Sequence, residues 1–182
     1  LIFVAYFQVY AQDLKPGKNK VTYLSEGDKI YAFLFLPEDY VEGQKRAAIV
    51  ITPPNTGVKE QTAGIYAEKL SQKGFITLVF DPRGFGESEG HPLLLDPYRQ
   101  AEDVRNSVSF IRTLNQVDTT NVFNMGMCAG SGISAFATAY DSRIKAQVMV
   151  SPYLNAADNY LKYLGGPANL RTNFLPLFAN AL

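Results

Sequence analysis

Residues 121–140, NVFNMGMCAGSGISAFATAY, contain the pattern that decides the fold. An apolar, strand-like run leads through a sharp turn into a helix-like run, with Cys128 at the apex between Gly126 and Gly130. This is the spacing of a nucleophile elbow, in which small flanking residues let the strand and the helix pass closely. A helix over about 129–140 would point its first free N–H groups at the sulfur and favour the thiolate. The pattern predicts a reactive cysteine.

Two other interpretations of the same stretch stay open at this point. A lone cysteine is most often a small buried hydrophobic residue. Gly130, Gly132 and Ala135 also fit the dinucleotide-binding pattern G-x-G-x-x-A. That pattern belongs to the first strand of its domain and expects an acidic residue closing the next strand, whereas the strand predicted at 145–150 runs into Ser151 and Pro152.

Composition limits the classes of partner. The 182 residues are 47% hydrophobic, which suits one domain with a buried core. Seventeen basic and 17 acidic side chains leave no net charge, and no basic run is present, so we expect no nucleic-acid partner. We expect a small-molecule substrate, no metal and no cofactor. The sequence does not determine the oligomeric state.

The N-terminal run LIFVAYFQVY, residues 1–10, is uncharged and apolar but too short to span a bilayer. Val9, Tyr10 and Ala11 suit a signal-peptidase site, so residues 1–12 are interpreted as the remnant of a signal peptide. This predicts export to the periplasm or the outside of a bacterial cell, without a stable membrane span in the mature form. A first amphipathic strand or helix is the alternative. A single cysteine allows no internal disulfide.

Strand and helix signals alternate through the rest of the chain. The predicted strands are a hairpin at 21–25 and 29–36, then 47–52, 75–80 and 145–150. One helix is predicted at 61–72, with Ile65, Leu70 and two alanines on one side, and a longer one begins at the N-cap Asp96. The alternation predicts an α/β fold with a mainly parallel, doubly wound sheet and helices on both faces.

Functional segments are expected where the parallel strands end, because ligands bind such sheets at the carboxyl ends of the strands. The segments at these ends are residues 53–57, 81–90 and 126–130. Within the second of them, Asp81 and Arg83 are interpreted as structural, with the arginine tying the glycine-rich loop by charge-assisted bonds. Glu60 is expected to complement the positive end of the helix at 61–72.

Three stretches carry a family resemblance: GVKEQTA at 57–63, DPRGFGESEG at 81–90, and GMCAG at 126–130, which leads to DSRI at 141–144. In this order and spacing the chain resembles the α/β-hydrolases, and more narrowly exported or bacterial proteins related to dienelactone hydrolases, which use a cysteine at the elbow. The resemblance covers about residues 21–153. It implies an α/β-hydrolase core over 20–153, incomplete at the C-terminus, and a lid, cap or truncated C-terminal region over 154–182.

The resemblance also implies a reaction. Cys128 would attack the carbonyl of an ester, lactone or thioester, and water would hydrolyse the resulting thioester intermediate. One oxyanion donor would be the backbone N–H of Ala129, the residue after the nucleophile. The other would come from the loop after the third strand, where Pro54 has no N–H, so Asn55 is the first choice and Thr56 the second.

A triad also needs an acid and a histidine after the nucleophile, and no histidine follows Cys128. His91 lies upstream, where a loop or capping role competes with catalysis. Asp158 is a possible acid, with a solvated loop position as its alternative. The acid and the histidine are therefore expected beyond residue 182, in a chain truncated at both ends and inactive alone. A non-catalytic protein of this fold that binds a ligand or partner is the second functional hypothesis.

Overall fold

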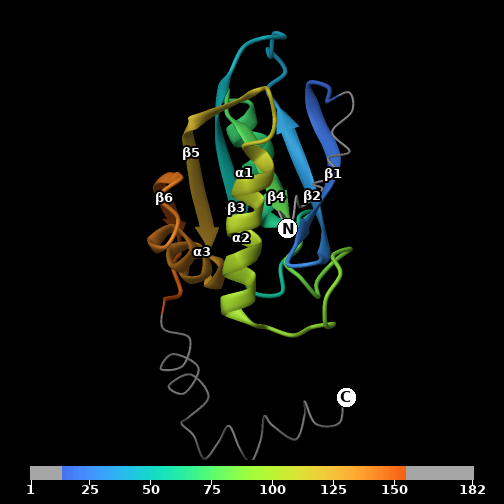
Figure 1. The fold of residues 1–182 in the computed structure, drawn as a ribbon, viewed down its shortest axis with the longest axis vertical. Helices are drawn as coiled ribbons and strands as arrows, with labels where there is room; N and C mark the ends of the chain where they lie inside the picture. The colour runs from blue at the N-terminus through green and yellow to red at the C-terminus, as the bar shows by residue number, and fades with distance from the viewer. Residues whose placement is uncertain (1–13, 155–182) are drawn as a thin grey trace, which may run out of the picture.

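The computed structural model describes residues 14–154 as a six-stranded sheet with helices on both faces (Figure 1). The strands are β1 (Gly17–Ser25), β2 (Asp28–Leu36), β3 (Arg46–Thr52), β4 (Ile76–Phe80), β5 (Val117–Met127) and β6 (Ile144–Val150). The helices are α1 (Thr62–Ser71), α2 (Pro97–Ile111) and α3 (Ala129–Ala139). The predicted signal remnant, Asp158 and nearly all of the predicted cap region lie outside the described residues.

The sheet has the order β1-β2-β4-β3-β5-β6. The β1–β2 hairpin joins β4 in antiparallel fashion, and β4, β3, β5 and β6 pair in parallel. The prediction of a mainly parallel sheet entered through a hairpin is confirmed. Each predicted strand and helix forms, and the largest differences are that β1 and β5 each begin four residues earlier than predicted, at Gly17 and Val117.

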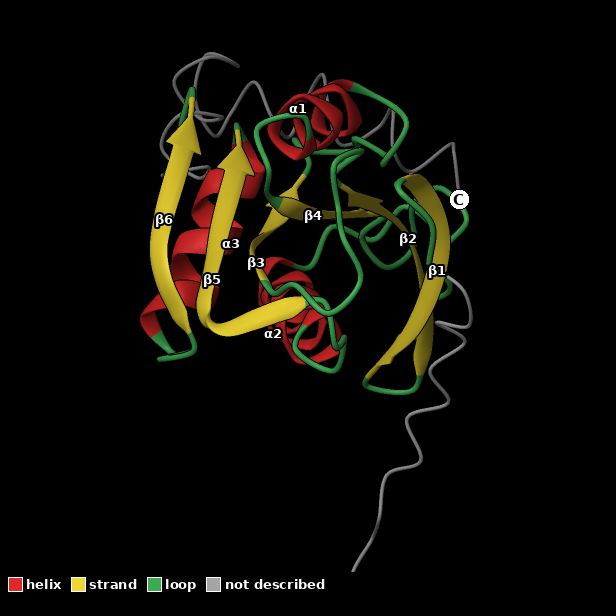
Figure 2. Cartoon of the chain, turned by 90° about the horizontal axis from the view of Figure 1, so that it is seen from above, coloured by secondary structure: helices red, strands yellow, loops and turns green. Residues whose placement is uncertain are grey.

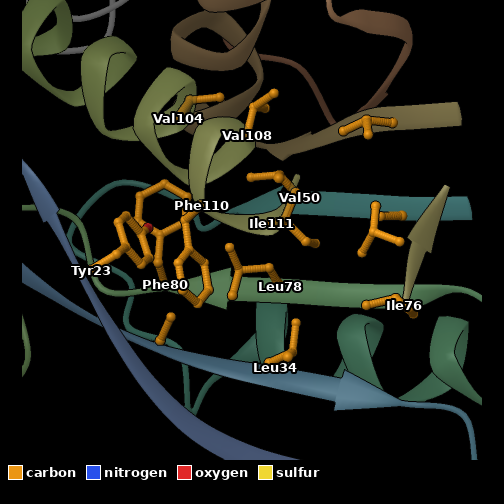
Figure 3. Packing of buried hydrophobic residues seen from close by; sticks show 14 of the residues in the cluster. Tyr23, Leu34, Val50, Ile76, Leu78, Phe80, Val104, Val108, Phe110 and Ile111 are labelled. Carbon is orange, nitrogen blue, oxygen red and sulfur yellow. The ribbon is translucent and has the colours of Figure 1, made fainter. Parts of the chain in front are cut away.

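Two apolar layers hold the helices to the sheet. Figure 2 shows α1 over one face and α2 with α3 over the other. All five residues of β4 are buried, as a strand covered on both faces requires. In the larger layer, residues of α2 pack on Val50, Leu78 and Phe80, and the rings of Tyr23 and Phe110 stack with centroids 4.9 Å apart (Figure 3).

Local sequence chemistry sets the start of α2, whereas tertiary packing sets which face of α1 is buried. Asp96 caps α2 as predicted, because its carboxylate accepts the N–H groups of Tyr98 at 3.1 Å and Arg99 at 3.2 Å. The prediction grouped Ile65 with Leu70 and two alanines on one side of this helix, but Ile65 is 58% exposed whereas the alanines are buried. Helix α1 instead buries its small residues Ala63, Ala67 and Ser71, which lets its backbone lie close to the sheet. No helix within residues 14–154 is long and apolar enough to cross a membrane.

The three predicted functional segments begin at one edge of the sheet. Parallel pairing places Thr52, the last residue of β3, opposite Gly126 of β5. Pairing of β3 with β4 brings residues 81–90 to the same edge. Because β2 runs antiparallel to β4, with Ala32 opposite Phe80, the turn of the β1–β2 hairpin also lies at this edge.

Candidate active site

Cys128 occupies the apex of a strained turn between β5 and α3. Its φ of 52° and ψ of −121° are unusual for a residue with a side chain, and the thiol is exposed. The Cys128 N–H donates to the carbonyl of Val150 at 3.0 Å, and its carbonyl accepts the N–H groups of Ser131 and Tyr153, each at 3.0 Å. These bonds fix the apex to β6 and to the chain that follows it. The interpretation of Cys128 as a buried hydrophobic residue is wrong.

The flanking glycines are required by close approach of backbones. A Cβ at Gly126 would lie 2.4 Å from the carbonyl oxygen of Gly130 and 2.6 Å from the Cα of Ser131. A Cβ at Gly130 would lie 2.2 Å from the carbonyl oxygen of Pro53. The first turn of α3 is therefore wedged between the end of β5 and the loop after β3.

A buried hydroxyl supports the elbow from within. Ser131 is fully buried, and its Oγ donates to the carbonyl of Gly126 at 2.7 Å and to that of Val150 at 3.4 Å. Gln147 of β6 donates to the Ser131 carbonyl at 3.1 Å and to the Ser134 hydroxyl at 2.8 Å. Ser131 follows the apex by three residues but lacks glycines at the flanking positions, so the sequence did not indicate it as the nucleophile, and its supporting role was not predicted. Its position three residues after the apex, on the inner face of the predicted helix, was the available signal.

The loop after β3 lies against the elbow. The contact between Pro53 and Gly130 joins it to α3, and a turn from Pro54 to Gly57 is closed by the Gly57 N–H donating to the Pro54 carbonyl at 2.8 Å. Asn55 and Thr56 occupy the middle of that turn, Thr56 with a positive φ of 56°. The Oδ1 of Asn55 is buried and has no hydrogen-bond partner in the described part of the chain.

The predicted donors therefore share one region. Ala129 is the first residue of α3, so its N–H has no partner within the helix. Asn55 and Thr56 are carried on the loop whose preceding residue, Pro53, contacts Gly130 in the same helical turn. The arrangement can present backbone N–H groups from two segments next to an exposed thiol, which is the chemistry of an oxyanion hole.

A buried lysine lies beside this loop. The Lys59 side chain is 1% exposed, and its ammonium contacts Asp81 at 2.6 Å, Glu87 at 2.6 Å and Glu60 at 2.9 Å. Burial alone would lower the pKa of Lys59, but the hydrogen bonds to these three carboxylates raise it well above its ordinary value. The sequence analysis missed Lys59, because one lysine in a polar turn carries no signal of burial. Glu60, expected at the helix terminus, pairs with this lysine.

Arg83 ties the loop after β4 to α2 and to the hairpin. Its guanidinium donates from Nε and Nη2 to the buried carboxylate of Asp103, at 2.9 and 2.6 Å, and Nη1 lies 3.0 Å from Glu26. Ser25 donates its hydroxyl hydrogen bond to the same Asp103 carboxylate at 2.7 Å. Burial raises the pKa of Asp103, against the lowering effect of its bonds with Arg83 and Ser25. The contacts agree with a structural role for Arg83.

His91 has no contact with the Cys128 thiol within residues 14–154. His91 is exposed in the loop after β4, with Nδ1 3.2 Å from the Pro92 carbonyl. Its own carbonyl lies against Gly84 of the same loop. Asp158 lies outside the described residues. Among residues 14–154 no group of His, Cys, Asp and Glu side chains is arranged to hold a metal ion.

Comparison with known proteins identifies the family. The family model Hydrolase_4, described as serine aminopeptidase, S33, matches residues 43–180. The chain therefore belongs to this family of the α/β-hydrolase superfamily. The family is described by the name of a serine enzyme, whereas the residue at the apex of the elbow in this chain is Cys128.

Individual relatives agree with the family. The chain is 37% identical to the uncharacterized protein YcjY of Escherichia coli over an alignment 171 residues long, which covers 85% of this chain and 56% of that protein. It is 30% identical to a thiohydrolase of Eupenicillium brefeldianum, over 78% of this chain and 44% of that enzyme. The solved structure of the hypothetical protein PA2218 from Pseudomonas aeruginosa superimposes with a TM-score of 0.73 at 34% identity, covering 84% of this chain and 53% of that one. The chain thus spans about half the length of the relatives it matches.

Proposed function

We propose that this chain is the nucleophile-bearing part of a cysteine-dependent hydrolase that cleaves an ester, lactone or thioester. The observation that carries the proposal is the exposed thiol of Cys128 at a strained apex between β5 and α3, next to the loop that holds Asn55 and Thr56. A thioester substrate is favoured by the similarity to a protein named thiohydrolase. The narrower likeness to dienelactone hydrolases is part of this proposal.

The proposed reaction has two steps. In the first, the Cys128 sulfur forms a bond to the substrate carbonyl carbon, and the oxyanion accepts hydrogen bonds from the N–H of Ala129 and from that of Asn55 or Thr56. Collapse of the tetrahedral intermediate expels the alcohol or thiol, which takes up a proton, and leaves a thioester on Cys128. In the second, water attacks the thioester, and the carboxylic acid and the free thiol are released.

Proton transfer in both steps requires a base. In α/β-hydrolases the triad acid and histidine follow the nucleophile in chain order, so we propose that residues outside the described part supply them. A nucleophile without its base loses most of its activity. The described residues alone are expected to be inactive, and the activity belongs to the full-length protein.

The test compares the full-length protein with its Cys128→Ala variant on short p-nitrophenyl esters and on a short acyl thioester. We expect hydrolysis by the wild type and loss of at least about 1000-fold in the variant. Cys128→Ser is the matched control, since it keeps a nucleophile of similar size and separates sulfur chemistry from loss of packing. Equal rates for the wild type and Cys128→Ala would refute the proposal and favour a non-catalytic ligand-binding or partner-binding protein.

Export is a separate proposal. It rests on residues 1–12, which lie outside the described residues. Fractionation of a bacterial cell that expresses the full-length protein, followed by N-terminal sequencing, should find a mature protein in the periplasm or medium that begins near Gln12 or Asp13.

A further inference from the structure

We propose that Lys59 is a positioning residue for the oxyanion hole: by binding Asp81 and Glu87 it fixes the loop that carries Asn55 and Thr56 to the end of β4. This inference rests on the proposed function, because the oxyanion hole is part of that function. Lys59 would touch neither substrate nor thiol, and it would act through the loop alone.

Lys59 is held twice by one carboxylate. Its backbone N–H donates to Oδ1 of Asp81 at 2.8 Å, and its Nζ donates to Oδ2 at 2.6 Å. Asp81 is itself fixed to the sheet, since it is fully buried and its N–H donates to the carbonyl of Tyr31 in β2 at 2.9 Å. Lys59 therefore has a defined place relative to the sheet through both its backbone and its side chain.

A short stretch of chain joins Lys59 to the proposed donors, Asn55 and Thr56. Three residues follow Thr56 to Lys59, so the chain between them spans at most about 10 Å even when extended. The Pro54–Gly57 turn fixes Asn55 and Thr56 relative to Gly57 at the start of this tether, because the Gly57 N–H donates to the Pro54 carbonyl. On the C-terminal side, the Lys59 carbonyl packs against Gly64 of α1, where a Cβ would lie 2.2 Å from it.

The loop is thus fixed at both ends. Pro53 is held by its contact with Gly130 of α3, and Lys59 is held by Asp81. Asn55 and Thr56 lie between these two points. Because an oxyanion donor must lie within about 2.7–3.1 Å of the developing charge, a small displacement of this loop removes its contribution. Release of the Lys59 end would therefore reach the chemistry without any change at Cys128.

The Lys59 ammonium is paired with more than one carboxylate. Three carboxylates surround the ammonium, and Glu87 also donates its N–H to Asp81 at 2.9 Å. The hydrogen bond and the charge of Lys59 lower the pKa of Glu87. Lys59 and Glu87 are therefore charged at neutral pH, and their contact joins the loop after β4 to the loop after β3.

The experiment uses the full-length protein and the variant Lys59→Met, which replaces the unbranched side chain with one that is a single atom shorter and uncharged. Two reactions of Cys128 are compared. Acylation by a p-nitrophenyl ester, followed as the burst of nitrophenolate, develops an oxyanion, whereas alkylation by iodoacetamide does not. We expect Lys59→Met to lower the acylation rate by about 100-fold or more, mainly in kcat. The alkylation rate should stay within about twofold of the wild type.

Lys18→Met is the matched control. The Lys18 ammonium lies over the same Phe33 ring as that of Lys59, at 4.7 against 5.1 Å, and it has no ion pair with a carboxylate among residues 14–154. Neither reaction should change in this variant. Unchanged acylation in Lys59→Met would overturn the inference, and so would parallel loss of acylation and alkylation, since that pattern indicates damage to the elbow itself.

Hydrogen exchange on the wild type tests the same contact without a variant, so a Lys59→Met protein that fails to fold does not end the test. In the wild type, the Lys59 amide, bound to a buried carboxylate, should exchange as slowly as the amides of β4. As a second measurement, Asp81→Asn should accelerate exchange over residues 55–61 but not over 129–131. Fast exchange of the Lys59 amide in the wild type would refute the inference. A wild type that is alkylated but never acylated would instead refute the proposed function, and the exchange result would still decide whether Lys59 holds the loop.

Discussion

Replacement of Gly126 by alanine tests whether the elbow is as tight as the structure describes. The added methyl group would lie 2.2 Å from the Ser134 Oγ, 2.4 Å from the Gly130 carbonyl oxygen and 2.6 Å from the Ser131 Cα. Two of these three atoms belong to the backbone of α3, so a change of side-chain rotamer cannot relieve them. The variant must separate the first turn of α3 from the end of β5.

The size of the effect follows from those contacts. Non-bonded carbon atoms settle at about 3.5–4.0 Å, so the helix must move by about 1 Å. Overpacking of this kind costs about 1–3 kcal/mol and occasionally more. With three contacts violated together we expect the upper end, about 3 kcal/mol. For a chain of this length that corresponds to a melting temperature lower by about 6–12 °C.

The measurement is thermal unfolding by circular dichroism, with Gly132→Ala as the control on the same helix. A Cβ at Gly132 would lie 3.0 Å from the carbonyl oxygen of Tyr153, which belongs to the chain after β6 and not to the β5–α3 interface. That variant should stay within about 1 kcal/mol of the wild type. Adding Ser134→Ala to Gly126→Ala removes one of the three contacts and should restore only part of the loss. A Gly126→Ala protein that melts within about 2 °C of the wild type would refute the described packing.

Three further predictions concern charge and the sheet edge. Arg83→Met should lower the free energy of unfolding, measured by urea titration, by about 3–5 kcal/mol, because it leaves the buried Asp103 without its cation. Arg99 is half-exposed, so Arg99→Met should lower it by no more than about 1 kcal/mol. Equal losses in the two variants would contradict the structural role of Arg83. The pKa of Asp141 is lowered, because its hydrogen bonds to Arg143 outweigh the opposing effect of its burial. The pair therefore stabilises the fold above the ordinary pKa of an aspartate, and this stabilisation is lost as the pH falls through the lowered pKa. The difference in melting temperature between the wild type and Asp141→Asn should shrink from about pH 6 to pH 3, and a constant difference would contradict this prediction. Strand β6 exposes apolar side chains, with Val148 56% and Met149 45% exposed, so the 182-residue chain should self-associate through this strand. Val148→Lys should reduce the self-association seen by size-exclusion chromatography, whereas a monodisperse wild-type monomer would show that the edge is covered.

The elements that the sequence predicted well are those whose signal is local. Asp96 followed by Pro97 specifies a helix start whatever the surroundings, and α2 begins there. The apolar run at 47–52 specifies a strand buried on both faces, and β3 is one. Gly126 and Gly130 around Cys128 specify a turn that needs space on both sides, and the contact distances show why. The fold class followed from the alternation of such signals.

The sequence alone determined the fold class, the strand that carries Cys128 and the turn that exposes it, because each of these depends on residues adjacent in the chain. Tertiary structure decided the rest. Ile65 faces solvent because α1 packs through its small residues, and no local pattern tells which side of a helix meets a sheet most closely. Lys59 is buried because Asp81 and Glu87, more than 20 residues away, neutralise it. A buried charge is specified by its partners, and partners brought together by folding leave no pattern at the position itself.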